Sequence, residues 1–481
     1  MRKPACNFHR TCLGLALAAT LGLGAPSLHA QETPILDQLL DKLKERGVLT
    51  EEEYQALKAE RDEERVQSRA ERRQRALREA QAVEKEEKAK EESKSTLVGR
   101  FKEGFTLESG DKQHGISISG RVHADYRSFM EDTAASTFDV RRAYLGVQGK
   151  FYNIYTFDVT GDFAQSGTTL DVAWFNAAWL QSAQVRFGQF KMPFSIEEQT
   201  SSRFIDFQER SMMNALVPAK ERGIMLHGDP FKGMTYGLAL SNGQGKNNNE
   251  TSVELDRPDV IARVAGNAAE WVGNPDMVLH AGLAYSNGTL AGNSAVPSGR
   301  TEARGVTFFQ TGNVASSAGT DVDRQRLGGE LSLAWGPFKL QGEYTKATYD
   351  TETGSDRDID AYYAAATWLI TGERYAKSYR SGAYRAIVPN KPLGSGGWGA
   401  WELGLRYSDF NAEDFTVTAA TASTAFTNKA DAWTLGLKWI PITNVRFYLN
   451  YVQTEFDTPI RVSGKNYDDE KAVTLRGALY F

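Results

Sequence analysis

The chain has 481 residues, with 24 Phe, 19 Tyr, 9 Trp and 44 Gly, and its formal net charge is −5. After the first 25 residues, no run of 18 apolar residues occurs, which excludes a protein that crosses a membrane with several helices. The balanced charge argues against a nucleic-acid binder. Both cysteines, Cys6 and Cys12, lie at the N-terminus, which excludes a disulfide scaffold or a cysteine–zinc site in the rest of the chain.

The N-terminus has the pattern of an export signal. Basic residues precede a short apolar run over residues 11–25, and Ala30 offers a small residue at a cleavage point. We therefore predict a signal peptide over residues 1–30. A cysteine-free, aromatic-rich exported chain points to the envelope of a Gram-negative cell.

Residues 31–95 have a helical pattern. Apolar residues recur at helical spacing from Ile35 to Leu43, and Thr50 with Glu53 forms the pattern of a capping box. Between residues 51 and 95, 26 of 45 residues are charged. We predict a periplasmic helical hairpin that continues as a long charged helix. An oligomeric coiled coil and a solitary solvated helix both fit, because the apolar seam is thin.

From residue 96 to residue 481 the apolar period changes to two. In the last stretch, Val473 to Phe481, apolar and polar residues alternate up to a terminal phenylalanine. A soluble antiparallel sandwich would also alternate. Charged residues on the polar face, aromatic residues at strand ends and the terminal phenylalanine favour an all-β, transmembrane antiparallel β-barrel in the outer membrane.

The alternation gives seventeen strand starts, near residues 115, 138, 153, 168, 184, 222, 234, 258, 276, 304, 323, 337, 358, 398, 430, 443 and 471. Bacterial single-chain barrels have an even number of strands, so one start is false, and the starts at 222 and 304 are the weakest. We predict about 16 strands, with 18 as the alternative. A barrel of that size has an open aqueous lumen.

The sequence offers little evidence of an enzyme motif. Residues 394–399 fit G-x-G-x-x-G, but they precede an alternating strand and no helix follows, so a dinucleotide site is excluded. The sequence has no HExxH, GxSxG or Walker motif. We expect no enzyme, no cofactor and no metal site, although spacing alone does not exclude a Ser/His pair of an outer-membrane hydrolase.

Two long basic connections stand out. The first, residues 187–223, combines hydroxyl and basic side chains that suit an anion: Lys191, Ser201, Ser202, Arg203 and Arg222. It either folds into the lumen as a constriction or lies outside, with its charges cancelled by nearby Glu and Asp. The second, residues 372–394, has five basic residues and one acidic residue. It either gathers anions at the mouth or binds lipopolysaccharide phosphates.

Arginines recur on the polar face of the strands. The pore-lining candidates are Arg121, Arg326, Arg406 and Arg446, and one of Arg141 and Arg142 also faces inward. Guanidinium groups match the geometry of phosphate. The alternative is that each arginine forms an ion pair that braces the wall.

Three motifs resemble the phosphate-selective porin O and P family: residues 139–163, residues 185–204 with 221–229, and residues 368–410. The resemblance covers roughly residues 31–481 and implies a sixteen-stranded, trimeric outer-membrane channel that favours phosphate-type anions. By position, Arg141 and Arg142 match the basic pair of the second strand. Lys191, Ser201, Ser202 and Arg203 match the constriction loop. Glu198 stands where phosphate-specific members place a lysine, so strict phosphate specificity does not follow.

The sequence therefore predicts an outer-membrane porin, a passive diffusion channel that prefers phosphate-type or other small anions. Its expected partners are small anions, outer-membrane lipid and lipopolysaccharide, and two further copies of the chain. A general or carbohydrate-type porin and an outer-membrane barrel enzyme are the alternatives.

Overall fold

A computed structural model describes residues 34–101, 104–164, 167–247, 258–290, 297–312, 314, 321–351 and 355–481. The chain divides into two compact units, residues 1–91 and residues 92–481. The predicted signal peptide, residues 1–30, lies outside the described residues.

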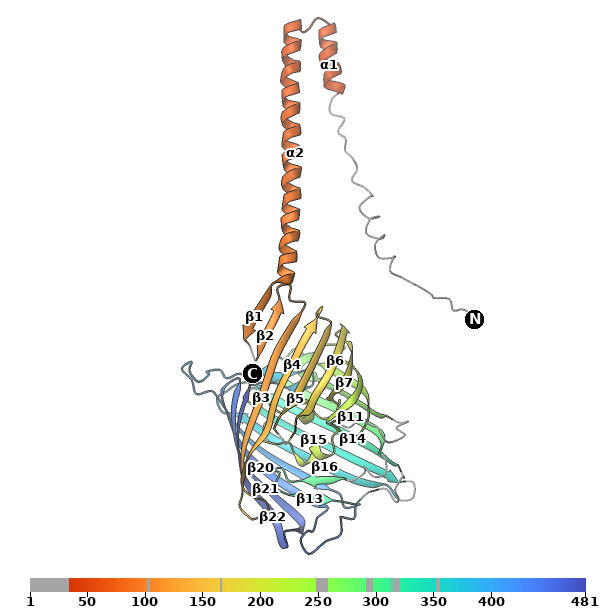
Figure 1. Cartoon of the computed structure of the whole chain (residues 1–481), viewed down its shortest axis with the longest axis vertical. Helices are drawn as coiled ribbons and strands as arrows, with labels where there is room; N and C mark the ends of the chain where they lie inside the picture. Colours follow the sequence, from red (N-terminus) through yellow and green to blue (C-terminus); the bar gives the residue numbers. More distant parts are fainter. Residues whose placement is uncertain are drawn as a thin grey trace, which may run out of the picture. The chain divides into compact units, whose positions relative to one another are not determined.

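The first unit contains two helices, α1 (Pro34–Glu45) and the long α2 (Glu51–Ser95) (Figure 1). The predicted capping box starts α2: the Thr50 N–H donates to the Glu53 carboxylate at 2.9 Å, and the Glu53 N–H donates to the Thr50 hydroxyl at 3.3 Å. Tyr54 joins the two helices, because its ring is buried and its hydroxyl donates to Asp41 at 2.6 Å. The hairpin thus forms from local signals that the sequence carries.

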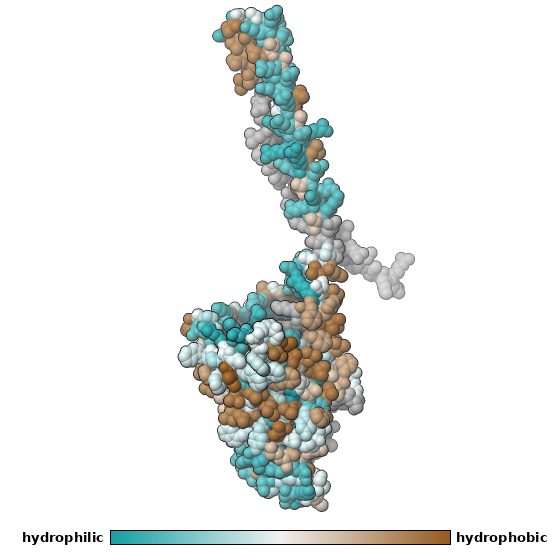
Figure 2. Space-filling model, turned by 90° about the vertical axis from the view of Figure 1, so that its left-hand side faces the viewer, coloured by the Kyte–Doolittle hydropathy of each residue, from teal (hydrophilic) through white to brown (hydrophobic). Residues whose placement is uncertain are grey.

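Residues 66–89 of α2 are exposed, and the surface of this helix is largely hydrophilic in Figure 2. Val66 and Leu77 of the apolar seam are 66% and 55% exposed. Residues 65–78 contain six arginines and one glutamate. The coiled coil and the solitary solvated helix therefore both remain predictions for this stretch.

The second unit is a β-barrel. Its sixteen wall strands, counted within the described residues, each pair antiparallel with the next (Figure 1). They are β3 (Gly115–Phe129), β4 (Thr137–Phe151), β5 (Tyr155–Asp162), β6 (Thr169–Leu180), β7 (Ala183–Lys191), β8 (Lys220–Gly228), β9 (Met234–Ser241), β10 (Asp259–Asn267), β11 (Met277–Leu290), β14 (Val322–Trp335), β15 (Phe338–Thr351), β16 (Arg357–Leu369), β19 (Ala400–Asn411), β20 (Lys429–Ile442), β21 (Val445–Val462) and β22 (Lys465–Tyr480). Pairing of β22 with β3, from Ala472 opposite Phe129 to Tyr480 opposite Arg121, closes the barrel. The prediction of sixteen strands is confirmed.

The remaining strands form hairpins. The start predicted near residue 304 was wrong: β12 (Ser298–Arg300) and β13 (Thr307–Gln310) pair only with each other, whereas the start near 222 is the wall strand β8. β17 (Tyr379–Arg380) and β18 (Ala383–Tyr384) form another pair. β1 (Leu97–Phe101) and β2 (Phe105–Ser109) form a hairpin that extends the sheet, since β2 pairs with the start of β3.

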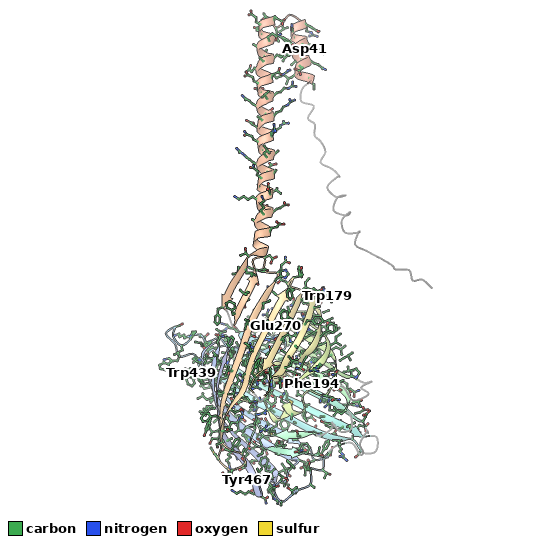
Figure 3. The ribbon with its side chains drawn as sticks, viewed as in Figure 1. Asp41, Trp179, Phe194, Glu270, Trp439 and Tyr467 are labelled. Carbon is green, nitrogen blue, oxygen red and sulfur yellow. The ribbon has the colours of Figure 1, made fainter. Side chains whose placement is uncertain are left out.

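The two faces of the wall differ as the alternation predicts. On β14, Leu327 and Leu331 are 54% and 65% exposed, whereas Arg326 and Glu330 of the opposite parity are buried. Stacked aromatic rings lie at one end of the wall, where Trp439 (labelled in Figure 3) contacts Trp401 and Phe447 with ring centroids 5.5 and 5.3 Å apart. Apolar residues outside and charged residues inside suit a wall between lipid and an aqueous interior.

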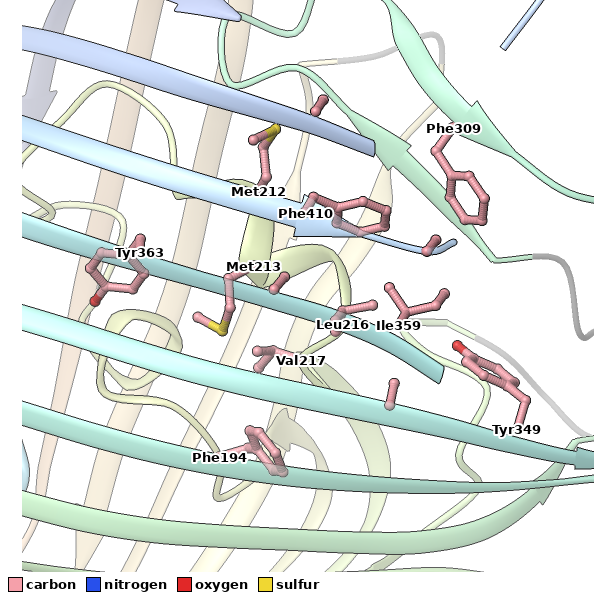
Figure 4. Packing of buried hydrophobic residues seen from close by; sticks show 14 of the residues in the cluster. Phe194, Met212, Met213, Leu216, Val217, Phe309, Tyr349, Ile359, Tyr363 and Phe410 are labelled. Atoms are coloured by element: carbon pink, nitrogen blue, oxygen red, sulfur yellow. The ribbon is translucent and has the colours of Figure 1, made fainter. Parts of the chain in front are cut away.

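Part of the interior is closed, in contrast to the open aqueous lumen predicted for a barrel of this size. A hydrophobic cluster fills part of it, built from buried loop residues such as Phe194 and Met213 against wall residues such as Ile359 and Phe410 (Figure 4). Small inward side chains on the wall, including Ala347 and Ala361, leave room for these loops. Alternation assigns a residue to a face but does not reveal that a loop will cover that face.

Short helices lie in the connections: α3 (Ile196–Gln199), α4 (Ala268–Trp271), η1 (Met212–Ala215) and η2 (Tyr375–Ser378). Among the described residues, no helix is both long enough and apolar enough to span a membrane.

Candidate functional site

The inward loop, residues 192–219 between β7 and β8, crosses the interior of the barrel. The backbone N–H groups of Ile196 and Glu197 donate to the carboxylate of Glu343 on β15, at 3.0 and 2.8 Å. Farther along the loop, the Lys339 ammonium donates to Asp206 at 2.7 Å. The loop therefore leaves one side of the barrel and is held by charged side chains on the other.

Glu198 is the internal counter-charge of this loop. Its carboxylate lies 3.5 Å from the Lys191 ammonium and 3.2 Å from an Arg210 guanidinium nitrogen. Burial alone would raise the pKa of Glu198, but Arg210 and Lys191 outweigh it and lower that pKa. Lys191 also donates to the carbonyls of Glu198 and Thr200, the latter at 3.1 Å. Lys191, predicted as an anion contact, is thus engaged within the protein.

Three arginines gather beside the residues of the inward loop that follow Thr200. We call Arg121, Arg203 and Arg446 the arginine cluster. Arg121 donates to the Ser202 hydroxyl at 2.5 Å. The Arg446 guanidinium lies 4.7 Å from the ring centroid of Tyr480, and that of Arg203 lies 5.9 Å from the same ring. Three distant parts of the sequence, at Arg121, Ser202–Arg203 and Arg446, are brought together here.

The guanidinium of Arg446 is the distinctive feature of this cluster. It is 1% exposed, and within the described parts of the chain neither of its terminal nitrogens has a hydrogen-bond partner. In the same residues, Arg446 forms no ion pair, and the partner of Arg121 is the uncharged Ser202 hydroxyl. The ring of Phe204, 5.0 Å away, and that of Tyr480 hold the Arg446 side chain without neutralising it.

Arg141 and Arg142 lie around another residue of the inward loop, Glu209. Arg141 Nε donates to the Glu209 carboxylate at 3.0 Å, and Arg142 lies 3.5 Å from a ring nitrogen of His123. Burial would raise the pKa of Glu209, but Arg476, Arg141 and Arg142 hold it well below its usual value. The basic pair is therefore partly neutralised.

The other predicted residues make contacts of their own, and Ser201 adjoins the arginine cluster through Arg203. Arg222 donates to Gln189 at 3.3 Å, and Arg326 donates to Ser286 at 3.4 Å. Ser201 accepts from the Arg203 N–H at 3.4 Å. Arg406 donates to Glu197 at 3.2 Å and to Glu302 at 2.5 Å, so it forms the kind of ion pair that the alternative reading of the strand arginines describes.

The second basic connection, within residues 370–399, lies at the end of the barrel that carries the short turns. The Tyr375 N–H donates to Gly336 in one such turn at 3.1 Å, and the Leu393 N–H donates to Pro441 beside another at 2.8 Å. Short turns are periplasmic in bacterial barrels. Because lipopolysaccharide occupies the outer leaflet, its phosphates do not reach this segment. The segment also meets the inward loop, since the Tyr384 N–H donates to the Thr200 hydroxyl at 3.3 Å.

Sequence reasoning missed the contribution of residues 297–312. Glu302 is buried and accepts from Ser408 and Thr434, each at 2.5 Å. Arg304 lies near Glu209 and Arg141, and burial lowers its pKa to about 10. The charged run Arg300 to Arg304 was the available signal, but a false strand start was placed on it. In the described residues, no three His, Cys, Asp or Glu side chains form a group that could hold a metal ion.

Residues 116–481 match the profile of the family described as phosphate-selective porin O and P. The chain belongs to this family. It is therefore an outer-membrane porin and not an enzyme. Porin O of Pseudomonas aeruginosa is 25% identical over 413 residues, which cover 78% of this chain and 90% of that protein.

Solved structures show similar barrels. The anion-selective porin from Comamonas acidovorans is 14% identical, with a TM-score of 0.49 over 76% of this chain and 100% of that chain. The trimer form of OmpT from Vibrio cholerae is 11% identical, with a TM-score of 0.47 over 76% of this chain and 99% of that chain.

Proposed function

We propose that this porin prefers small oxyanions of the phosphate type and that the arginine cluster is where it selects them. The main support for this proposal is Arg446, a buried guanidinium whose two terminal nitrogens lack protein partners among the described residues. An isolated buried charge is unfavourable unless something compensates it. An anion that enters from the lumen supplies that compensation.

The chemistry of the cluster favours an oxyanion over a halide. Two parallel N–H groups of a guanidinium match two oxygens of a phosphate or carboxylate. Arg121 and the hydroxyl of Ser202, which lie 2.5 Å apart, offer further polar groups beside the same loop. Arg203 adds a third positive charge, and its field repels solute cations from the arginine cluster.

Paired residues limit the selectivity. Arg141, Lys191 and Arg406 each lie beside a carboxylate, so they add less to the potential than an unpaired arginine does. We therefore expect a preference for anions and not strict phosphate specificity, consistent with Glu198 in place of a lysine.

The test compares Arg446→Gln with the unchanged protein in planar bilayers. We expect the reversal potential in a salt gradient to move toward lower anion preference and phosphate block of chloride current to weaken. Arg100→Gln is the matched control, because Arg100 is exposed on the β1–β2 hairpin. Unchanged reversal potential and phosphate block in Arg446→Gln would favour a general or carbohydrate-type porin.

We also propose the finer assignments that the family suggests. Residues 1–30 act as the export signal, residues 31–95 lie in the periplasm, and residues 96–481 form the porin domain. Three copies assemble as a homotrimer. Mass spectrometry of the mature N-terminus and the mass of the detergent-solubilised assembly test these assignments.

A further inference from the structure

We propose that Arg406 is a positioning residue that fixes two loops to the barrel wall and thereby keeps them ordered inside the barrel. The two loops are the inward loop, residues 192–219, and the segment 297–312 that carries the β12–β13 hairpin. This proposal does not depend on which ion the channel prefers.

Arg406 stands on β19 between one carboxylate from each loop. Its Nη1 donates to Glu197 Oε1 at 3.2 Å and also to the Glu209 carbonyl at 3.1 Å. Its Nη2 donates to Glu302 Oε2 at 2.5 Å. A planar guanidinium can make these bonds in different directions at once, which a lysine ammonium on a flexible stem does less well.

Each of the two carboxylates, Glu197 and Glu302, also accepts hydrogen bonds from its own neighbours, which fix its orientation. Ser211 donates to Glu197 through its N–H at 3.1 Å and its hydroxyl at 2.8 Å. Ser408 and Thr434 on the wall donate to Glu302. Such donors hold each buried carboxylate in a fixed orientation.

Arg406 is not placed to contact a passing solute. Both of its terminal nitrogens already donate to carboxylates of the protein, and the ring of Phe207 lies 4.6 Å from its guanidinium carbon. The cavities that it lines have volumes of about 20 and 10 Å³. Such volumes admit about one water molecule and exclude a phosphate. The role of Arg406 is therefore to hold the loops, not to bind the anion.

The inward loop has other charged anchors on the wall, including Lys339 to Asp206 and Arg476 to Glu209, but these contacts do not include Glu302 of the second loop. Glu343 holds the start of α3 from β15, with Tyr363 donating to it at 2.7 Å. Arg406 is the group that ties α3 to the second loop. Loss of this connection should let both loops fluctuate in the lumen.

The test is a charge-neutral double variant, Arg406→Gln with Glu302→Gln, because it removes the connection without changing net charge. Cys6 and Cys12 are replaced by serine in the full chain, so that Ser201→Cys carries the only spin label. We expect loss of the immobilised label signal and greater open-channel noise. Arg406→Lys, which keeps the charge, should restore part of the immobilised signal.

The matched control is Arg263→Gln with Glu330→Gln. This buried pair, 2.6 Å apart, contacts Gly382 instead of the inward loop. It should leave the label signal unchanged. An immobile label and normal noise in the Arg406/Glu302 variant would overturn the proposal. If the Arg406/Glu302 variant does not show the mobility shift on heating that marks a folded barrel, Arg406→Lys is the deciding variant. A label signal and noise level identical to those of the unchanged protein in Arg406→Lys would overturn the proposal.

Discussion

The backbones of Gly120 and Phe481 pair with each other: the Gly120 N–H donates to the Phe481 carbonyl at 2.8 Å, and the Phe481 N–H donates to the Gly120 carbonyl at 3.1 Å. The last residue of the chain is thereby joined to the first wall strand. The Phe481 ring also covers Gly120 so closely that a β-carbon at that position would overlap it. Glycine is required here for the close approach of a ring, not for an unusual backbone angle.

This contact predicts that Gly120→Val weakens barrel closure by about 1–3 kcal/mol, the usual cost of forcing extra atoms into a packed site. Deletion of Phe481 should impair outer-membrane assembly while leaving secretion across the inner membrane intact. Fractionation and the heat-dependent shift in gel mobility measure both effects. Gly329→Val is the control, because its β-carbon would meet open space on the lipid-facing side. Normal surface levels of the truncated chain would count against the prediction.

The fold predicts the spectrum of the purified protein in detergent. Circular dichroism should be of β type, with a smaller helical contribution from α1 and α2. Removing residues 34–91 should eliminate that contribution and leave the β signal, since these residues form a separate compact unit. A helix-dominated spectrum of the full chain would contradict the structure.

The ion pairs of Glu198 predict that Glu198→Gln raises anion preference. The change leaves Lys191 and Arg210 without their counter-charge. At an effective dielectric of about 20 and a distance of about 5 Å, one unit charge alters an ion's energy by about 3 kcal/mol before screening by salt. The reversal potential in a salt gradient measures the effect, with exposed Glu79→Gln as the control.

Glu198→Lys should behave differently. It would place a third cation beside Lys191 and Arg210 in a buried position, so the inward loop should lose its ordered conformation. Noisy conductance would reveal this outcome. A quiet channel with stronger phosphate block would show instead that the loop accommodates the lysine.

The capping box of α2 predicts a pH dependence. Hydrogen bonds from the Thr50 N–H and hydroxyl lower the pKa of Glu53 below its usual value of 4.5. Because the pKa is lower in the folded state, this stabilisation is present above pH 4.5 and is lost as the pH falls through the folded-state pKa. Thermal melts of the helical signal at neutral and acid pH measure it. The Glu53→Gln variant should lack this part of the pH dependence, and an identical profile in both proteins would refute the assignment.

The sequence by itself determined the secondary structure and the class of fold. Periods of 3.6 and two residues separate the helical unit from the barrel, because helices and strands present successive side chains differently. The capping residues Thr50 and Glu53 and the terminal Phe481 are local signals, and the structure contains the contacts that they predict. The odd strand count could not be resolved locally, because β13 near residue 307 and the wall strand β8 near residue 220 are both short polar–apolar runs.

Only the tertiary structure decided which charged side chains in the interior lack an opposite charge beside them. Arg406 and Arg446 both lie on the inward face of a strand, yet Arg406 is held between Glu197 and Glu302, whereas Arg446 meets two aromatic rings. Glu197, Glu302 and Phe204 come from loops more than a hundred residues away, whereas Tyr480 lies on wall strand β22, and the placement of all four depends on closure of the whole barrel. Alternation fixes the face on which a side chain lies, but the field around it depends on chain segments that no local pattern brings together.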